Sequence, residues 1–60
     1  MPLLPRDAAY LWDILEAAEA IRGYIAGLDL ARYAEDRQVR SAVEGELEII
    51  GEAARRLSAE

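Results

Sequence analysis

Apolar residues recur at steps of three and four along the first part of the chain, which is the spacing of one helix face. This first row consists of Leu11, Ile14, Leu15, Ala18, Ile21, Ile25 and Leu28. Pro5 suits the first helical turn, where its missing N–H would be unpaired in any case, and Gly27 suits the position after the last turn. The pattern predicts a helix over residues 5–26.

A second row with the same spacing follows toward the C-terminus. It consists of Val39, Val43, Leu47, Ile50, Ala54 and Leu57. Asp36 precedes this row as a candidate N-cap, and Arg55 and Arg56 lie where the negative end of a helix dipole favours cations. These features predict a second long helix over residues 37–57. A connector over residues 27–36 between helices of similar length favours antiparallel neighbours.

Two interpretations of the connector remain open at Asp29. It can cap a single helical turn containing Leu30 and Tyr33, whose apolar parts would fold over the end of the hairpin, or it can begin the second long helix directly. In both cases the predicted fold class is all-α. The chain is expected to be one domain, residues 1–60, built as an antiparallel hairpin of two long helices.

The apolar arc of the first helix is wider than one neighbour can cover, because Tyr10 and Tyr24 extend it on one side and Ala8 and Trp12 on the other. A chain of 60 residues without cysteine also lacks disulfides to support a small core. We therefore expect two hairpins to pair into a four-helix bundle, as a homodimer. The candidate interface residues are Leu11, Trp12, Leu15, Ile25, Val43, Leu47, Ile50 and Leu57.

Charge and composition exclude several functions. The net charge is −5, which disfavours direct binding to nucleic acid. No run of 18 uncharged apolar residues and no signal sequence is present, so a cytoplasmic protein without membrane contact is expected. Histidine and cysteine are both absent. No catalytic, cofactor-binding or metal-binding residue is therefore assigned, and no cofactor is expected.

Two charged residues interrupt the apolar rows. Arg22 and Glu46 could form an ion pair, within or between chains, that fixes the register of the helices. Alternatively both lie at the edge of the apolar rows, with Arg22 extending to water. Helical glycines disfavour a helix by about 1 kcal/mol each, and Gly51, beside the apolar rim, suggests packing against a second neighbour.

An acidic ridge runs along the second long helix, because Glu44, Glu48 and Glu52 are four residues apart. Three interpretations are open: a docking ridge for a basic partner, a metal site, or a solvated face in which arginines near the helix end relieve Glu52. The metal site lacks the histidines that carboxylate-bridged bundles usually add.

The chain resembles a known family over residues 6–58. The resemblance is carried by RDAAYLWDILEAAEAIRGYIAG, by a short connector with Tyr33 and Asp36, and by AVEGELEIIGEAARRLS. These segments resemble the HepT-like proteins, the DUF86 branch of the HEPN superfamily. The resemblance implies an all-helical, usually dimeric toxin of a toxin–antitoxin pair, whose partner is an MntA-like nucleotidyltransferase.

Family members resemble ribonucleases that use an Arg-x4–6-His motif, often followed by a tyrosine that the partner adenylylates. This sequence contains no histidine, so no catalytic residue can be transferred to it. We expect the chain to correspond to the N-terminal helical half of a HepT-like protein, without ribonuclease activity of its own. The alternatives are a stand-alone helical interaction module, or a ribonuclease whose motif comes from another chain.

Overall fold

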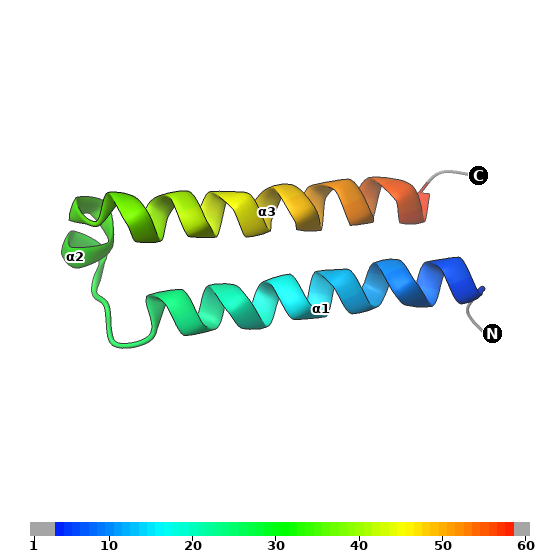
Figure 1. The fold of residues 1–60 in the computed structure, drawn as a ribbon, viewed down its shortest axis with the longest axis horizontal. Helices are drawn as coiled ribbons and strands as arrows, with labels where there is room; N and C mark the ends of the chain where they lie inside the picture. The colour runs from blue at the N-terminus through cyan, green and yellow to red at the C-terminus, as the bar shows by residue number, and fades with distance from the viewer. Residues whose placement is uncertain (1–3, 59–60) are drawn as a thin grey trace.

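The computed structural model describes residues 4–58 and forms a hairpin of helices (Figure 1). Two long helices, α1 (Pro5–Ile25) and α3 (Arg37–Ser58), run antiparallel and pack along their length, and the short helix α2 (Leu30–Glu35) joins them. No strand occurs in the described residues, so the all-α hairpin is confirmed. The ends of the predicted domain, residues 1–3 and 59–60, lie outside this part.

Local signals account for both ends of α1. Pro5 opens the helix, and the amide of Ala8 donates the first backbone hydrogen bond, to the carbonyl oxygen of Leu4 at 3.0 Å. At the other end Gly27 has a φ of 78°, a left-handed conformation that residues with a Cβ rarely adopt. The chain therefore leaves the helix axis here and turns toward α3.

Two aspartates start the helices that follow. The Asp29 carboxylate accepts a hydrogen bond from the amide of Arg32 at 2.8 Å, and the Asp36 carboxylate accepts one from the amide of Val39 at 3.0 Å. Each aspartate thus caps a helix N-terminus. Of the two interpretations of Asp29, the structure has the first, a separate short helix, and α3 begins after Asp36.

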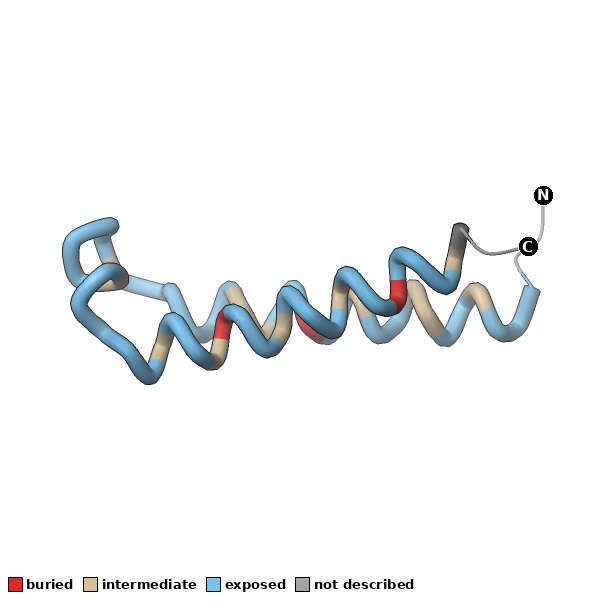
Figure 2. The backbone as a smooth tube through the Cα atoms, turned by 90° about the horizontal axis from the view of Figure 1, so that it is seen from above, coloured by how far each residue is buried: buried red, intermediate tan, exposed pale blue. Residues whose placement is uncertain are grey.

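The two long helices meet along a seam of residues that are buried or half-buried. Its members are Tyr10, Ile14, Ala17 and Ile21 from α1, Leu28 from the connector after it, and Val39, Val43, Glu46, Ile50, Ala53 and Leu57 from α3. Successive seam residues in α3 are three or four apart, the spacing of a coiled-coil contact line. Only Ala17, Val43 and Ala53 are fully buried among the described residues, and all three are small (Figure 2).

The seam is displaced from the centre of the predicted rows. Those rows included Leu15 and Ala18 in α1, and Leu47 and Ala54 in α3, and the structure leaves all four exposed. Neighbouring positions replace them, because small alanines in the seam let the two backbones approach closely. Each wide apolar arc is therefore covered along one edge only.

The molecule is a single layer of helices. Its extents are 42 × 17 × 13 Å, and the smallest corresponds to the thickness of one helix. The radius of gyration is 13.9 Å, whereas a compact chain of this length has about 10 Å. The accessible surface is 4876 Å², about 1,000 Å² more than a compact monomer of this mass exposes. Stable domains usually have two packed layers, and this chain supplies one.

Candidate functional site

The hairpin has two broad faces, and one of them is apolar. In an antiparallel pair, residues one position after the seam residues project from the same side of both helices, because each helix turns by 100° per residue. The middle of this side holds three residues without charge from each helix, which we call the apolar face: Leu11, Leu15 and Ala18 from α1, and Leu47, Gly51 and Ala54 from α3. Toward the connector the same side continues with Arg22 of α1 and with Arg40 and Glu44 of α3. All are exposed except Leu11, which is half-buried.

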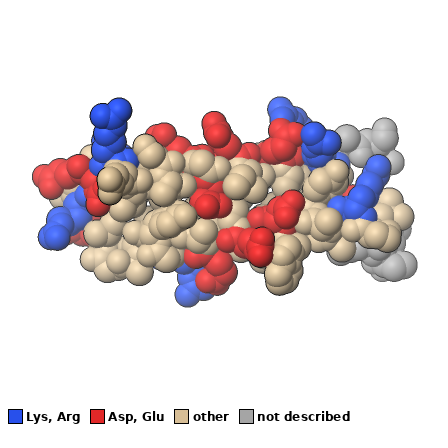
Figure 3. Space-filling view, viewed as in Figure 1, with Lys and Arg blue, Asp and Glu red and all other residues tan. Residues whose placement is uncertain are grey.

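The opposite side, which we call the acidic face, is lined by carboxylates. Two shallow hollows along the boundary between the long helices contain Asp13, Glu16, Glu19, Glu46, Glu48 and Glu52. Figure 3 shows acidic side chains following this boundary over the middle of the hairpin. Within residues 4–58 no group of three carboxylates could hold a metal ion. The face presents negative charge without a built ligand site.

The predicted interface residues separate into two sets. Val43 is buried in the seam, and Ile50 and Leu57 are half-buried there. The rest lie partly or wholly outside: Leu11 is half-buried, and Trp12, Leu15, Ile25 and Leu47 are exposed. The first set closes the hairpin itself, so only the second remains available to a neighbour.

The predicted ion pair between Arg22 and Glu46 is not formed within the hairpin. The Arg22 guanidinium instead contacts the Glu19 carboxylate at 3.1 Å, one helical turn away, and both side chains are exposed. Glu46 is half-buried in the seam, and its carboxylate lies 3.5 Å from the hydroxyl group of Tyr24. A pair between Arg22 and Glu46 of different chains stays a prediction.

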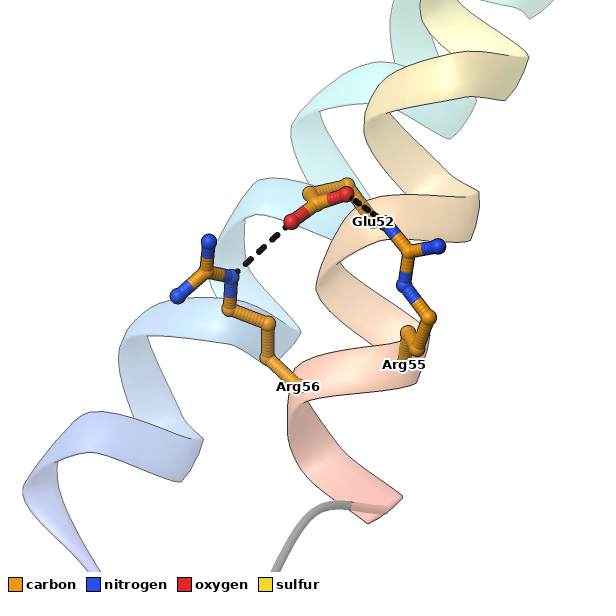
Figure 4. A network of polar contacts seen from close by, with 3 residues as sticks. All are labelled: Glu52, Arg55 and Arg56. Atoms are coloured by element: carbon orange, nitrogen blue, oxygen red, sulfur yellow. Dashed lines mark hydrogen bonds and ion pairs between the residues drawn. The ribbon is translucent and has the colours of Figure 1, made fainter.

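Arginine side chains neutralise the negative charge of the acidic ridge of α3 at one end only. The Glu52 carboxylate binds both Arg55 and Arg56, the latter at 3.0 Å (Figure 4). Hydrogen bonds from Arg56 and then Arg55 lower the pKa of the Glu52 carboxyl group. The reciprocal bond to Glu52, followed by one to Tyr10 of α1, raises the pKa of Arg56. In the described residues, no ion pair reaches Glu44 or Glu48.

Two further groupings were not anticipated from the sequence. Arg6, Tyr10, Arg55 and Arg56 line a hollow at the end of the hairpin where the termini lie. A second, mainly apolar hollow at the other end is lined by Ile21, Ile25, Leu28, Asp29, Leu30, Tyr33 and Val43. We expected the side chains of Leu30 and Tyr33 to cover the end of the hairpin. Tyr33 is half-buried, as expected, but Leu30 is 82% exposed, so the expectation is wrong for Leu30. α2 is short, and Leu30, at its first position, is held out toward solvent.

The side chains of both faces are of types that bind other surfaces. The chain has no histidine and no cysteine, so neither a thiolate nor an imidazole base is present. Carboxylates and guanidinium groups on exposed helix faces bind partners of opposite charge, and apolar faces bind other apolar surfaces. No helix in the described part of the chain has the length and apolar character needed to cross a membrane.

Comparison with known proteins identifies the family. Neither a curated protein nor a solved structure gives a significant match. A family model described as "Ribonuclease HepT-like" matches residues 14–60. The matched segment contains most of α1 and all of α2 and α3, whereas Arg6, Asp7 and Asp13, on which the resemblance also rested, precede it. Since the model covers more than half of the chain, this protein belongs to the HepT-like family.

Proposed function

We propose that this chain is a HepT-like component of a toxin–antitoxin system, and that it acts as a helical dimerisation or partner-binding module. One observation carries the proposal: the HepT-like family model matches this chain, although the chain contains no histidine. The ribonuclease motif of the family needs that residue, so these 60 residues contribute helices and contact surface rather than an active site.

The single-layer fold supports a binding role. The apolar face leaves Leu15 61% exposed and Leu47 53% exposed, and burial of such side chains stabilises an assembly by about 1.5–3 kcal/mol each. A second copy of the chain is the first proposed partner. An MntA-like nucleotidyltransferase is the second, and the acidic face offers it a complementary surface if its own surface is basic.

Analytical ultracentrifugation of the purified chain tests the assembly role. We expect a sedimentation equilibrium mass of twice the chain mass of 6.7 kDa at micromolar concentration. A mass that stays at the monomer value up to 100-fold higher concentration would refute the homodimer. Incubation with RNA tests the second half of the proposal: no cleavage is expected, and cleavage that survives rigorous purification would contradict it.

The alternative is a stand-alone helical interaction protein, and the genome separates the two. The toxin–antitoxin role predicts an Arg-x4–6-His segment encoded beyond codon 60 and a nucleotidyltransferase gene beside it. If neither is present, the stand-alone role is favoured. In that case the dimer measurement retains its meaning, because both roles require the same apolar surface to be covered.

A further inference from the structure

We propose that two copies of the chain pair through the apolar face, with Leu15 of one copy seated over Gly51 of the other. The two-fold axis runs parallel to the helices. This inference rests on the homodimer proposed above and adds which surface closes it and in which arrangement. Four helices then surround one core, and α1 of each copy lies against α3 of its partner.

The apolar face has matching high and low points. Gly51 has no side chain, and a Cβ atom added there would meet no atom within 4 Å, so α3 presents a low, open point on its surface at that position. Leu47 and Ala54 lie one helical turn to either side and border the hollow. On α1 the exposed side chain of Leu15 projects from the same face. A ridge and a hollow on one surface suit an isologous interface, in which each copy contributes both.

The register follows from contacts between the helices. Tyr10 and Arg56 line the same two hollows toward the terminal end, and Ala17 lines another hollow together with Glu46 and Ile49. Residues 15 and 51 therefore lie at similar heights along the hairpin, as do residues 22 and 44. A two-fold axis parallel to the helices preserves height and places α1 of one copy on α3 of the other. Each Leu15 then meets the hollow at Gly51 of the partner copy.

Charge supports this arrangement over the alternative. Arg22 and Glu44 flank the apolar face at similar heights, and in the chosen arrangement each Arg22 lies opposite Glu44 of the second copy. With the axis perpendicular to the helices, α1 would pack on α1 and α3 on α3. Arg22 would then face the N-terminal end of the other α1, around Ala8, where the neighbouring Asp7 is half-buried and its carboxylate already lies 3.6 Å from Arg6. The parallel axis brings each exposed Arg22 to an exposed Glu44 of the other copy.

The exposed area is sufficient for such a dimer. The chain exposes about 1,000 Å² more than a compact monomer of its mass, and a standard interface buries about 800 Å² on each partner. Two hairpins stacked through this face also form the second layer that the fold lacks. The acidic faces remain on the outside, where their like charges do not confront each other.

A matched pair of glycine substitutions tests which face is used. Gly51→Arg fills the hollow on the apolar face, and Gly45→Arg adds the same charge and bulk on the opposite side of α3, where the space is equally open. Both changes favour helix formation, so neither is expected to unfold the chain. We expect Gly51→Arg to raise the dimer dissociation constant at least 100-fold and Gly45→Arg to change it less than threefold.

The result separates this inference from the homodimer itself. If the wild-type chain is monomeric, the homodimer and its face both fail. If the wild-type chain dimerises and Gly51→Arg dimerises equally well, the homodimer stands and the assignment of the face is wrong. Circular dichroism of both variants confirms that helix content is retained.

Disulfide trapping tests the arrangement, and the absence of native cysteine makes it unambiguous. Leu15→Cys combined with Gly51→Cys should give a covalent dimer on oxidation. Leu15 and Gly51 of one chain project from the same face and not toward each other, so a bond within the chain is disfavoured. Leu15→Cys alone should remain uncrosslinked. Efficient crosslinking of that single variant would instead indicate the perpendicular axis and overturn the proposed arrangement.

A charge exchange gives an independent check. Arg22→Glu and Glu44→Arg should each weaken the dimer about tenfold, since each alters two contacts per dimer. The double variant should return to within threefold of the wild-type value. Arg22→Glu combined with Glu19→Arg restores only the ion pair within α1, so the dimer of this variant should remain weaker than that of the wild type. A rescue by Glu19→Arg that equals the rescue by Glu44→Arg would contradict the pairing between copies.

Discussion

The seam and the apolar face lie on the same two helices, yet the most buried side chains of the seam are smaller than the most exposed ones of the apolar face. The three residues buried in the seam, Ala17, Val43 and Ala53, are small, whereas the apolar face exposes Leu15 and Leu47. A self-sufficient core has the reverse order, with its largest apolar side chains inside. The difference indicates that small seam residues set how closely the helices pack, and that large apolar side chains of the hairpin stay exposed.

The largest expected effect comes from adding bulk to the seam. Ala17 is 2% exposed, and Ala17→Leu should lower the free energy of unfolding by about 1–3 kcal/mol because the helices must separate. Urea denaturation followed by circular dichroism measures the change. Ala9→Leu is the matched control, since Ala9 is exposed on the same helix outside both regions. Equal stability of the two variants would show that the seam is not closely packed.

Replacing Glu46, the charged residue of the seam, should have a smaller effect on stability, and in the opposite direction. Glu46 is half-buried between Val43 and Ile50 in the contact line, so Glu46→Leu should raise the free energy of unfolding by about 1 kcal/mol. Thermal unfolding measures the gain, and Glu46→Gln controls for the loss of charge alone. A large gain with an unchanged oligomeric state would also exclude Glu46 as the residue that sets register. A loss of stability would mean that the carboxylate makes a necessary contact.

A comparable effect is expected at the start of α3, away from both regions. Asp36→Ala removes the bond to the amide of Val39 and should lower the free energy of unfolding by about 1 kcal/mol. Asp36→Asn keeps the cap without the charge and should remain close to wild type in urea denaturation. If Asp36→Asn loses as much as Asp36→Ala, charge rather than capping is responsible.

The smallest effect is expected at the Glu52 cluster, which is exposed. The arginines lower the pKa of the Glu52 carboxyl group below its ordinary value of 4.5, so the folded state favours the carboxylate. Its contribution to stability is present above pH 4.5 and is lost as the pH falls through the lowered pKa. Glu52→Gln should therefore be slightly less stable than wild type at pH 7 and equal to it at the acid end of the titration. A difference that persists there would indicate a cause other than ionisation.

Local features of the fold could be predicted from the sequence, because they depend on near neighbours. Pro5, Gly27 and Asp36 mark the helix boundaries through their own backbone and side-chain chemistry, and the structure places the boundaries within one residue of the prediction. The family could be identified for a similar reason, since a contiguous segment of sequence carries the match.

The side of each helix that forms the seam could not be predicted in the same way. The apolar arc of each helix is wide enough to accept a neighbouring helix along either of its edges. Hydrophobic periodicity places the predicted row of contact residues midway between these two edges. The deciding residues are Ala17 and Ala53, whose small apolar surface gives a weak signal, and Glu46, whose charge argues against a seam position. Which edge is used depends on how closely two backbones approach, a property of the pair of helices.

The two aspartate caps are local contacts that need no second molecule to form. Asp29 and Asp36 fix the reversal of chain direction through hydrogen bonds that span only three residues each. Contacts of such short range form rapidly, before slower encounters between separate molecules. A hairpin can thus be shaped during synthesis of one chain, and if two copies pair as proposed, its stability increases with the concentration of the chain. Expression level would then control the amount of folded protein as well as the amount made.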